Sequence, residues 1–153
     1  MLIINRNAGQ SNLANREQWL EQTLAKIPAG SRILDAGAGE LNYKKFCQHL
    51  NYVSRDFAQY DGTGDSAGLQ TKTWDQTRLD IISDITSIPQ PDGAFDAVMC
   101  IEVLEHLPDP LNTMKELARL VRLGCYLVLD RAFQFSYAFR PIFLSPRVQP
   151  LFL

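Results

Sequence analysis

The sequence predicts an α/β protein built on a doubly wound, mostly parallel sheet. Short apolar runs, which are typical of buried strands, alternate with stretches whose apolar residues recur at helical spacing. A parallel sheet covered on both faces requires this alternation. A glycine-rich turn also directly follows one of the strands. The chain has 153 residues, 46% of them apolar, which is enough for one domain with a buried core.

The first predicted element is a helix over residues 11–27, because its apolar side chains gather on one side. Pro28 and Gly30 end this helix. Residues 32–35 are predicted as a strand, and after the glycine turn we expect a second helix over residues 41–50. Strand, glycine turn and helix therefore follow one another, as they do where an α/β fold binds a nucleotide.

The remaining core elements alternate in the same way. Residues 52–56 are predicted as a second strand and residues 81–84 as a short third one. A strongly apolar fourth strand covers residues 95–101. Helical apolar spacing predicts a helix over residues 111–121, and the fifth strand follows over residues 126–129.

Residues 58–78 break this pattern, because they hold three glycines among polar residues and show no helical apolar spacing. Long irregular loops are uncommon inside a compact domain and often serve a function. We expect either a loop that lies over a ligand at the end of the second strand or a surface insertion.

Composition excludes several function classes. A formal net charge of -2 and a pI near 5.6 argue against a broad phosphate-binding surface, so we expect no nucleic-acid partner. No apolar run approaches the roughly 20 residues that span a bilayer, and residues 1–10 lack the apolar stretch of a signal peptide. We expect a cytoplasmic protein with no membrane partner. Cys47, Cys100 and Cys125 suggest neither a disulfide framework nor a metal site and are expected in the core.

The glycine turn is the strongest chemical signal. In a doubly wound sheet, ligands bind beyond the carboxyl ends of the strands, where this turn lies. Gly37 and Gly39 allow the backbone to turn sharply and to approach a ligand closely. Asp35 precedes them, and Asp56 falls about 20 residues further on, at a strand end where a carboxylate meets ribose hydroxyls. Isolated Gly-x-Gly pairs are often plain turns, but this context favours a ligand site.

Two segments resemble the class I S-adenosylmethionine-dependent methyltransferases. Residues 33–39, Ile-Leu-Asp-Ala-Gly-Ala-Gly, are similar to the family's first motif, Asp-x-Gly-x-Gly after an apolar strand. Residues 95–107 are similar to the fourth strand and following segment of the group called type 11. Between them, Ser83-Asp84-Ile85 resembles the step that holds adenine. The resemblance covers about residues 32–129 and implies a Rossmann-like fold and methyl transfer.

The resemblance also implies the residues that bind S-adenosylmethionine, namely Asp35, Gly37, Gly39, Asp56, Asp84, Ile85, Ile101 and Glu102. The two glycines would line the methionine part of the cofactor, with Asp35 fixing the turn or contacting the amino acid end. Asp56 would bind the ribose diol, and Asp84 would accept from the adenine amino group while the next backbone N–H donates to a ring nitrogen. Carboxylates suit a ligand that carries a sulfonium and an ammonium group. As an alternative, these aspartates could only cap or hydrogen-bond loops.

Ile101 and Glu102 would border the cofactor near its sulfur, although Glu102 could also be a solvated carboxylate. Methyl transfer from a sulfonium is an in-line displacement that gains rate from alignment and from the exclusion of water, so no catalytic residue is obligatory. For a hydroxyl or carbon acid acceptor a general base helps, and His106 is the candidate because histidine exchanges protons near neutral pH. The competing interpretation is a structural bend over residues 105–108.

The sequence departs from the family in its turns and at its C-terminus. Leu41 stands where many members have a third glycine, and residues 122–125 replace the usual Pro-Gly-Gly turn. The family continues through two more strands, so we expect a sheet that is incomplete at the C-terminal strands. If the tail that follows is not native, the fifth strand becomes an edge of this sheet. Residues 130–153 are rich in phenylalanine and arginine and have no clean periodicity. One hypothesis is a reading-frame shift near Leu129, against natural divergence or a clipped gene model, and the coding sequence decides between them.

We therefore expect one methyltransferase-like domain over residues 1–153, with an N-terminal helical segment (1–30), a cofactor-binding core (31–129) and an atypical tail (130–153). Its predicted activity is methyl transfer to an unidentified, small-molecule acceptor. The alternatives are a catalytically inactive cofactor-binding remnant and a nicotinamide dinucleotide enzyme. The dinucleotide fingerprint needs a third glycine where Asn42 stands. Nothing in the sequence indicates the oligomeric state.

Overall fold

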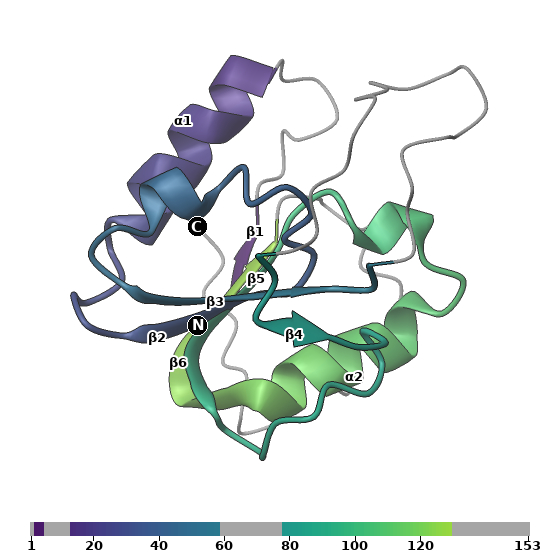
Figure 1. Cartoon of the computed structure of the whole chain (residues 1–153). Coiled ribbons are helices and arrows are strands. Elements are labelled where there is room, and N and C mark those ends of the chain that lie inside the picture. Colours follow the sequence, from purple (N-terminus) through teal and green to yellow (C-terminus); the bar gives the residue numbers. More distant parts are fainter. Residues whose placement is uncertain (1, 5–12, 59–77, 130–153) are drawn as a thin grey trace.

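A six-stranded parallel sheet dominates the computed structural model, which describes residues 2–4, 13–58 and 78–129 (Figure 1). The strands are β1 (Leu2–Ile4), β2 (Arg32–Asp35), β3 (Asn51–Asp56), β4 (Ile81–Ile82), β5 (Phe95–Cys100) and β6 (Val121–Leu129). The helices are α1 (Leu13–Leu24) and α2 (Pro110–Leu120), with 3₁₀ helices at Lys44–Phe46 and Leu104–His106. Every neighbouring pair is parallel, in the order β1-β6-β5-β2-β3-β4. The predicted α/β class and parallel sheet are confirmed.

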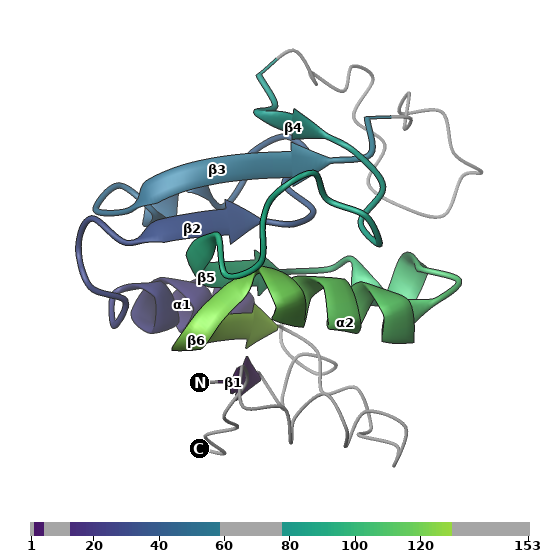
Figure 2. The same cartoon turned by 90° about the horizontal axis from the view of Figure 1, so that it is seen from below.

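Helices α1 and α2 lie on opposite faces of this sheet (Figure 1), and Figure 2 shows the arrows of β2, β3 and β6 pointing the same way. Successive residues of a strand point to opposite faces. Ile33 of β2 therefore packs in the cluster under α1 with Leu20 and Leu24, whereas its neighbour Leu34 packs under α2 with Leu117. All five side chains are fully buried. Burial on both faces explains why these strands are continuous apolar runs in the sequence.

Helix α2 begins and packs as its sequence indicates. Asp109 caps its N-terminus by accepting a hydrogen bond from the backbone N–H of Asn112 at 3.0 Å. Pro110 stands in the first turn, where its missing N–H loses no helical hydrogen bond. Met114 and Leu117 bury the apolar side against the sheet. The helix predicted over residues 111–121 is thus confirmed, and it carries its capped end to the carboxyl ends of the strands.

The helix predicted over residues 41–50 is wrong. The structure forms turns there and only the short 3₁₀ helix Lys44–Phe46. Leu41 has a φ of 64°, a left-handed conformation that an α-helix cannot contain, and no side chain caps the segment that follows. Tyr43 and Cys47 are nevertheless buried under α1. The apolar spacing that suggested a helix therefore marks residues that turns, rather than an α-helix, bury in the core.

The edge next to β6 also differs from expectation. β1, which the sequence analysis did not predict, pairs in parallel with β6, so β6 is not an edge among the described residues. A strand of three residues is too short to show a period-two pattern. β6 itself begins at Val121 rather than at residue 126. Residues 122–125, which replace the family's Pro-Gly-Gly turn, belong to this strand and shift its register against β5, with Gly124 at a φ of 76°.

The other strand predictions agree with the structure to within a few residues, and β2 has the predicted bounds. Most of the expected loop over residues 58–78 and all of the tail 130–153 lie outside the described residues. The ligand-covering loop and the reading-frame hypothesis therefore stay predictions.

Candidate functional site

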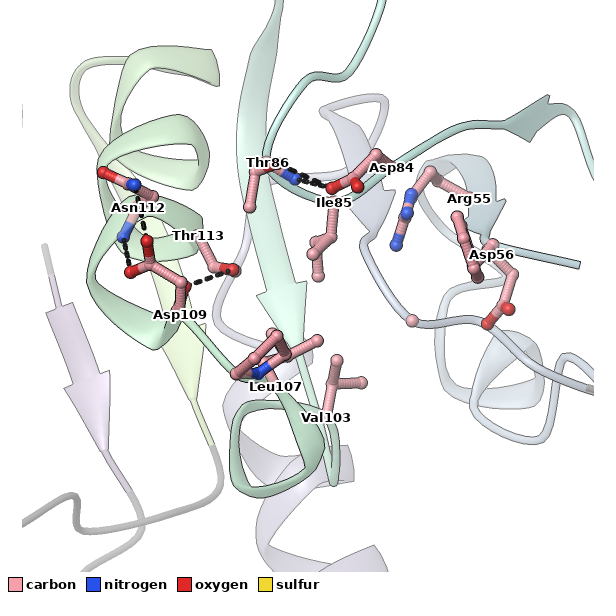
Figure 3. A pocket seen from close by; sticks show the side chains of 13 residues that line it. Arg55, Asp56, Asp84, Ile85, Thr86, Val103, Leu107, Asp109, Asn112 and Thr113 are labelled. Atoms are coloured by element: carbon pink, nitrogen blue, oxygen red, sulfur yellow. Dashed lines mark hydrogen bonds between the residues drawn. The ribbon is translucent and has the colours of Figure 1, made fainter. Parts of the chain in front are cut away.

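A pocket of about 500 Å³ lies at the carboxyl ends of the central strands, bounded by the turns after β2, β3 and β4 and by the start of α2 (Figure 3). Its lining residues are Gly37, Arg55, Asp56, Phe57, Asp84, Ile85, Thr86, Val103, Leu107, Pro108, Asp109, Asn112 and Thr113. The chain runs from β2 toward one sheet edge through β3 and β4 and toward the other through β5 and β6. The pocket is therefore at the switch point where doubly wound folds bind their ligands.

Asp56 ends β3 at the wall of this pocket. Its Oδ2 accepts a hydrogen bond from the backbone N–H of Gly39 at 3.0 Å, and its Oδ1 accepts one from the backbone N–H of Ala58 at 3.2 Å. Each carboxylate oxygen can accept a second bond, so the group is oriented but not saturated. The structure thereby brings together two residues that the sequence placed in one site, Asp56 and the turn at Gly39.

Asp84 and Ile85 follow β4 and line the same pocket. Asp84 Oδ1 accepts from both the backbone N–H and the hydroxyl of Thr86, each at 2.7 Å. These hydrogen bonds lower the pKa of Asp84, so this exposed group is a carboxylate at neutral pH. Ile85 is buried and lies on the pocket side of the turn in Figure 3. One polar and one apolar group thus stand next to each other, as a heterocycle with polar edges and apolar faces would need.

Asp35 is fully buried beneath the glycine turn and does not line the pocket. Its Oδ2 accepts from the Tyr52 hydroxyl at 2.7 Å. Burial raises the pKa of Asp35 to about 7, and the charge of Asp56 adds to this, while the bonds to Tyr52 and the Gly37 backbone act in the opposite direction. Within the described part of the chain, Oδ1 has no well-formed hydrogen bond. A buried acceptor of this kind is available to a donor from a ligand or from water.

Gly37 is needed because of its packing against Val103, which follows β5. A Cβ atom added to Gly37 would lie 2.1 Å from Val103 Cγ2, far inside contact distance. The prediction attributed this glycine to close approach of a ligand, whereas the closest neighbour that the structure shows is a side chain. Both residues line the pocket, so the contact between the two turns shapes its wall.

The profile of a family described as a methyltransferase domain matches residues 10–140. The chain belongs to the class I methyltransferase domain family. Membership implies S-adenosylmethionine as the cofactor.

Among curated relatives, the ubiquinone biosynthesis O-methyltransferase of Dechloromonas aromatica is 31% identical over 118 residues, covering 75% of this chain and 49% of that protein. Ajmaline N-methyltransferase of Rauvolfia serpentina is 28% identical and covers 63% of this chain and 34% of that protein. The chain thus spans about half or less of the length of these relatives.

Solved structures show the same fold. The YcgJ protein of Bacillus subtilis aligns with a TM-score of 0.56 at 23% identity, covering 76% of this chain and 50% of that one. The [4+2]-cyclase SpnF aligns with a TM-score of 0.55 at 23% identity, covering 78% and 47% of the respective chains. A fold that also carries a cyclase does not by itself define a reaction, so the chemistry of this methyltransferase domain must be argued from its site.

Four predicted cofactor residues of the methyltransferase domain lie outside the pocket lining, namely Asp35, Gly39, Ile101 and Glu102. Ile101 is buried in the core under α1. Glu102 adopts a left-handed φ of 57°, accepts a hydrogen bond from the Tyr43 hydroxyl at 2.9 Å and forms an ion pair with Arg16 of α1. The structure shows Glu102 connecting α1 to the segment after β5, which the sequence could not indicate because these partners are distant along the chain.

His106 also lies apart from the pocket lining. It ends the 3₁₀ helix Leu104–His106 and is exposed, and its backbone N–H donates to the Val103 carbonyl at 3.0 Å. The segment 103–107 nevertheless supplies two lining residues, Val103 and Leu107. His106 is thus next to the pocket in sequence without contributing a side chain to its wall.

Sequence reasoning missed two contributions to the pocket of this methyltransferase domain. Arg55 and Phe57 flank Asp56, and the start of α2 supplies Asp109, Asn112 and Thr113. The Asp-Pro step at the start of α2 was a readable signal, because a helix that starts at the carboxyl end of a strand points its N-terminus at the ligand crevice. Arg55 gave no such signal, since it stands inside a predicted strand.

No group of three or more His, Cys, Asp and Glu residues in the described ranges could hold a metal ion. No helix among the same residues is long and apolar enough to span a membrane.

Proposed function

We propose that this pocket binds S-adenosylmethionine and that the protein transfers its methyl group to a small-molecule acceptor. The observation that carries the proposal is the placement of Asp56 and Asp84 on one pocket at the switch point of the sheet. Family membership supports the cofactor.

The residues present suit such a cofactor. We assign the ribose diol to Asp56, whose oxygens keep further lone pairs, and the adenine to Asp84 and Ile85. Asp84 Oδ2 accepts no hydrogen bond from the described residues, so it is available to the adenine amino group. The turn at Gly37 and Gly39 would hold the methionine part. Oδ1 of buried Asp35, which has no well-formed hydrogen bond among the described residues, suits a donor at that end, directly or through water.

The bound cofactor would supply a methyl group activated by its sulfonium. The work of the chain is then to orient this group and to exclude water, because an in-line displacement gains most from alignment. The apolar wall of Ile85, Val103 and Leu107 serves that purpose. Where the acceptor is a hydroxyl or a carbon acid, we retain His106 as the candidate general base. In that role it would receive the acceptor's proton on a ring nitrogen.

The acceptor is proposed as a small molecule on two grounds. The net charge of -2 disfavours nucleic acid, and the relatives carry names of O- and N-methyltransferases of small molecules. Those names differ in the atom methylated, so the proposal includes both hydroxyl and amine acceptors.

Isothermal titration of the chain with S-adenosylmethionine and, separately, with NAD tests the cofactor. Saturable binding of S-adenosylmethionine alone is the expected result, and binding of NAD alone would overturn the proposal. Turnover with a panel of hydroxyl and amine acceptors then separates an active methyltransferase from a remnant that only binds the cofactor.

A further inference from the structure

Arg55 is a buried cation on the floor of the pocket. It precedes Asp56 in β3, its residue is only 3% exposed, and it belongs to the pocket lining. Removing a guanidinium from water is unfavourable unless its charge and its N–H groups find partners. Its contacts therefore indicate what this side chain does in the fold.

The partners of Arg55 come from the turns on either side of β3. Its Nη1 donates to the carbonyl of Ala36, the residue before Gly37, at 2.9 Å. Its Nε donates to Ser83 Oγ at 3.3 Å, and its Nη2 donates to the Ser83 carbonyl. One planar side chain thus links the turn after β2 to the turn after β4.

The charges around Arg55 favour the same arrangement. Figure 3 shows the guanidinium between Asp84 and Asp56, and both carboxylates stabilise its charged form against the effect of burial. In return, the cation offsets the repulsion between two carboxylates that face one pocket. The hydrogen bonds that the Asp84 carboxylate accepts come from Thr86 and are local, so they do not connect this turn to the glycine turn as the Arg55 side chain does.

We propose that Arg55 is a positioning residue that sets the spacing between the glycine turn and the turn at Asp84, and thereby pre-organises the pocket for the adenosine part of the cofactor. This inference rests on the proposed function. A bidentate, planar group suits the role because it holds two backbone carbonyls at once, which a lysine ammonium cannot do with the same geometry. Pre-organisation acts on affinity by reducing the ordering that the ligand must impose.

The test compares Arg55→Met with Arg32→Met in the full chain. Arg32 is a matched control, because it donates to the Ala94 carbonyl and stacks on Phe95 at the opposite end of the sheet from the pocket. The probes are S-adenosylmethionine, S-adenosylhomocysteine and adenosine, measured by isothermal titration at a temperature where circular dichroism shows each variant folded. We expect Arg55→Met to weaken the binding of all three probes by a similar factor of roughly 10 or more. Arg32→Met should leave the three affinities unchanged.

Other outcomes separate the possible roles. Wild-type affinities in a folded Arg55→Met variant overturn the inference. A change in affinity for S-adenosylmethionine alone also overturns it, since that would be a charge effect at the sulfonium.

If Arg55→Met does not fold, Arg55→Lys keeps the charge and replaces Arg55→Met in the test. An intermediate, ligand-independent loss then supports positioning, whereas affinities within twofold of wild type overturn it. A wild-type chain that binds none of the three probes removes the proposed function and this inference with it.

Discussion

Asp56 is the residue on which the cofactor assignment depends most. Both of its oxygens are oriented by backbone N–H groups, so the carboxylate is in place before a ligand arrives. We expect Asp56→Ala to weaken S-adenosylmethionine binding by roughly 1–3 kcal/mol through lost charge-assisted hydrogen bonds. Titration calorimetry measures this, with the exposed Asp92→Ala as control. Unchanged affinity in Asp56→Ala would remove this residue from the site.

Asp35 predicts a pH dependence of stability. Burial raises its pKa to about 7 from the ordinary value of 3.8, so the native state holds this proton more tightly than the unfolded chain does. The resulting stabilisation is complete below about pH 4 and is lost as the pH rises through about 7. Asp35→Asn cannot ionise, so the difference in unfolding free energy between wild type and variant should change by on the order of 4 kcal/mol over that window.

Urea unfolding of both proteins at several pH values measures this difference. The amide introduced by Asp35→Asn would keep an acceptor for the Tyr52 hydroxyl, which limits other effects of the substitution. A difference that stays constant from about pH 4 to pH 8 would contradict a buried, protonated Asp35.

At the scale of elements, the turns after β2 and β5 depend on each other. Because a Cβ on Gly37 would collide with Val103, we expect Gly37→Ala to destabilise the fold by about 1–3 kcal/mol and to deform the pocket wall. The double variant Gly37→Ala, Val103→Ala should recover part of this loss, since the second change removes the clashing methyl groups. Thermal unfolding of the two single variants and the double variant completes the cycle. Strictly additive effects would show that the glycine serves another purpose.

The elements also show where local signals suffice. Helix α2 has a cap, a proline in its first turn and a clear apolar side, and these agree with its burial. The segment 41–50 has apolar spacing but no cap, and Leu41 takes a left-handed conformation, so its burial under α1 is achieved by turns. Apolar spacing alone reports which residues are buried and not which backbone conformation buries them.

For the whole molecule, cofactor binding should appear as added stability. At a concentration of S-adenosylmethionine about 100 times its Kd, the native state gains about 2.7 kcal/mol. For a chain of this size, that corresponds to a rise in Tm of roughly 5–10 °C. Differential scanning fluorimetry measures the shift, with NAD at the same concentration as the control. Equal shifts for both ligands, or no shift with S-adenosylmethionine, would contradict a selective cofactor site.

The candidate site was accessible from the sequence only in part. Gly37, Asp56, Asp84 and Ile85 line the pocket, as strand ends of a parallel sheet must meet at one edge. Asp35, Gly39, Ile101, Glu102 and His106 do not line it, and their assigned roles stay predictions. Arg55 could not be found, because its partners lie 19 and 28 residues away along the chain.

By itself the sequence determined the fold class, the bounds of β2, the presence of α2 and the strand ends that carry carboxylates. These follow from local periodicity and turn chemistry, which act over a few residues. Only the tertiary structure decided that β1 pairs with β6, that Gly37 packs against Val103, that Glu102 joins Arg16 and Tyr43, and that Arg55 links two turns. Such contacts depend on which distant segments the sheet order brings together, and no local pattern encodes a partner far away in the chain.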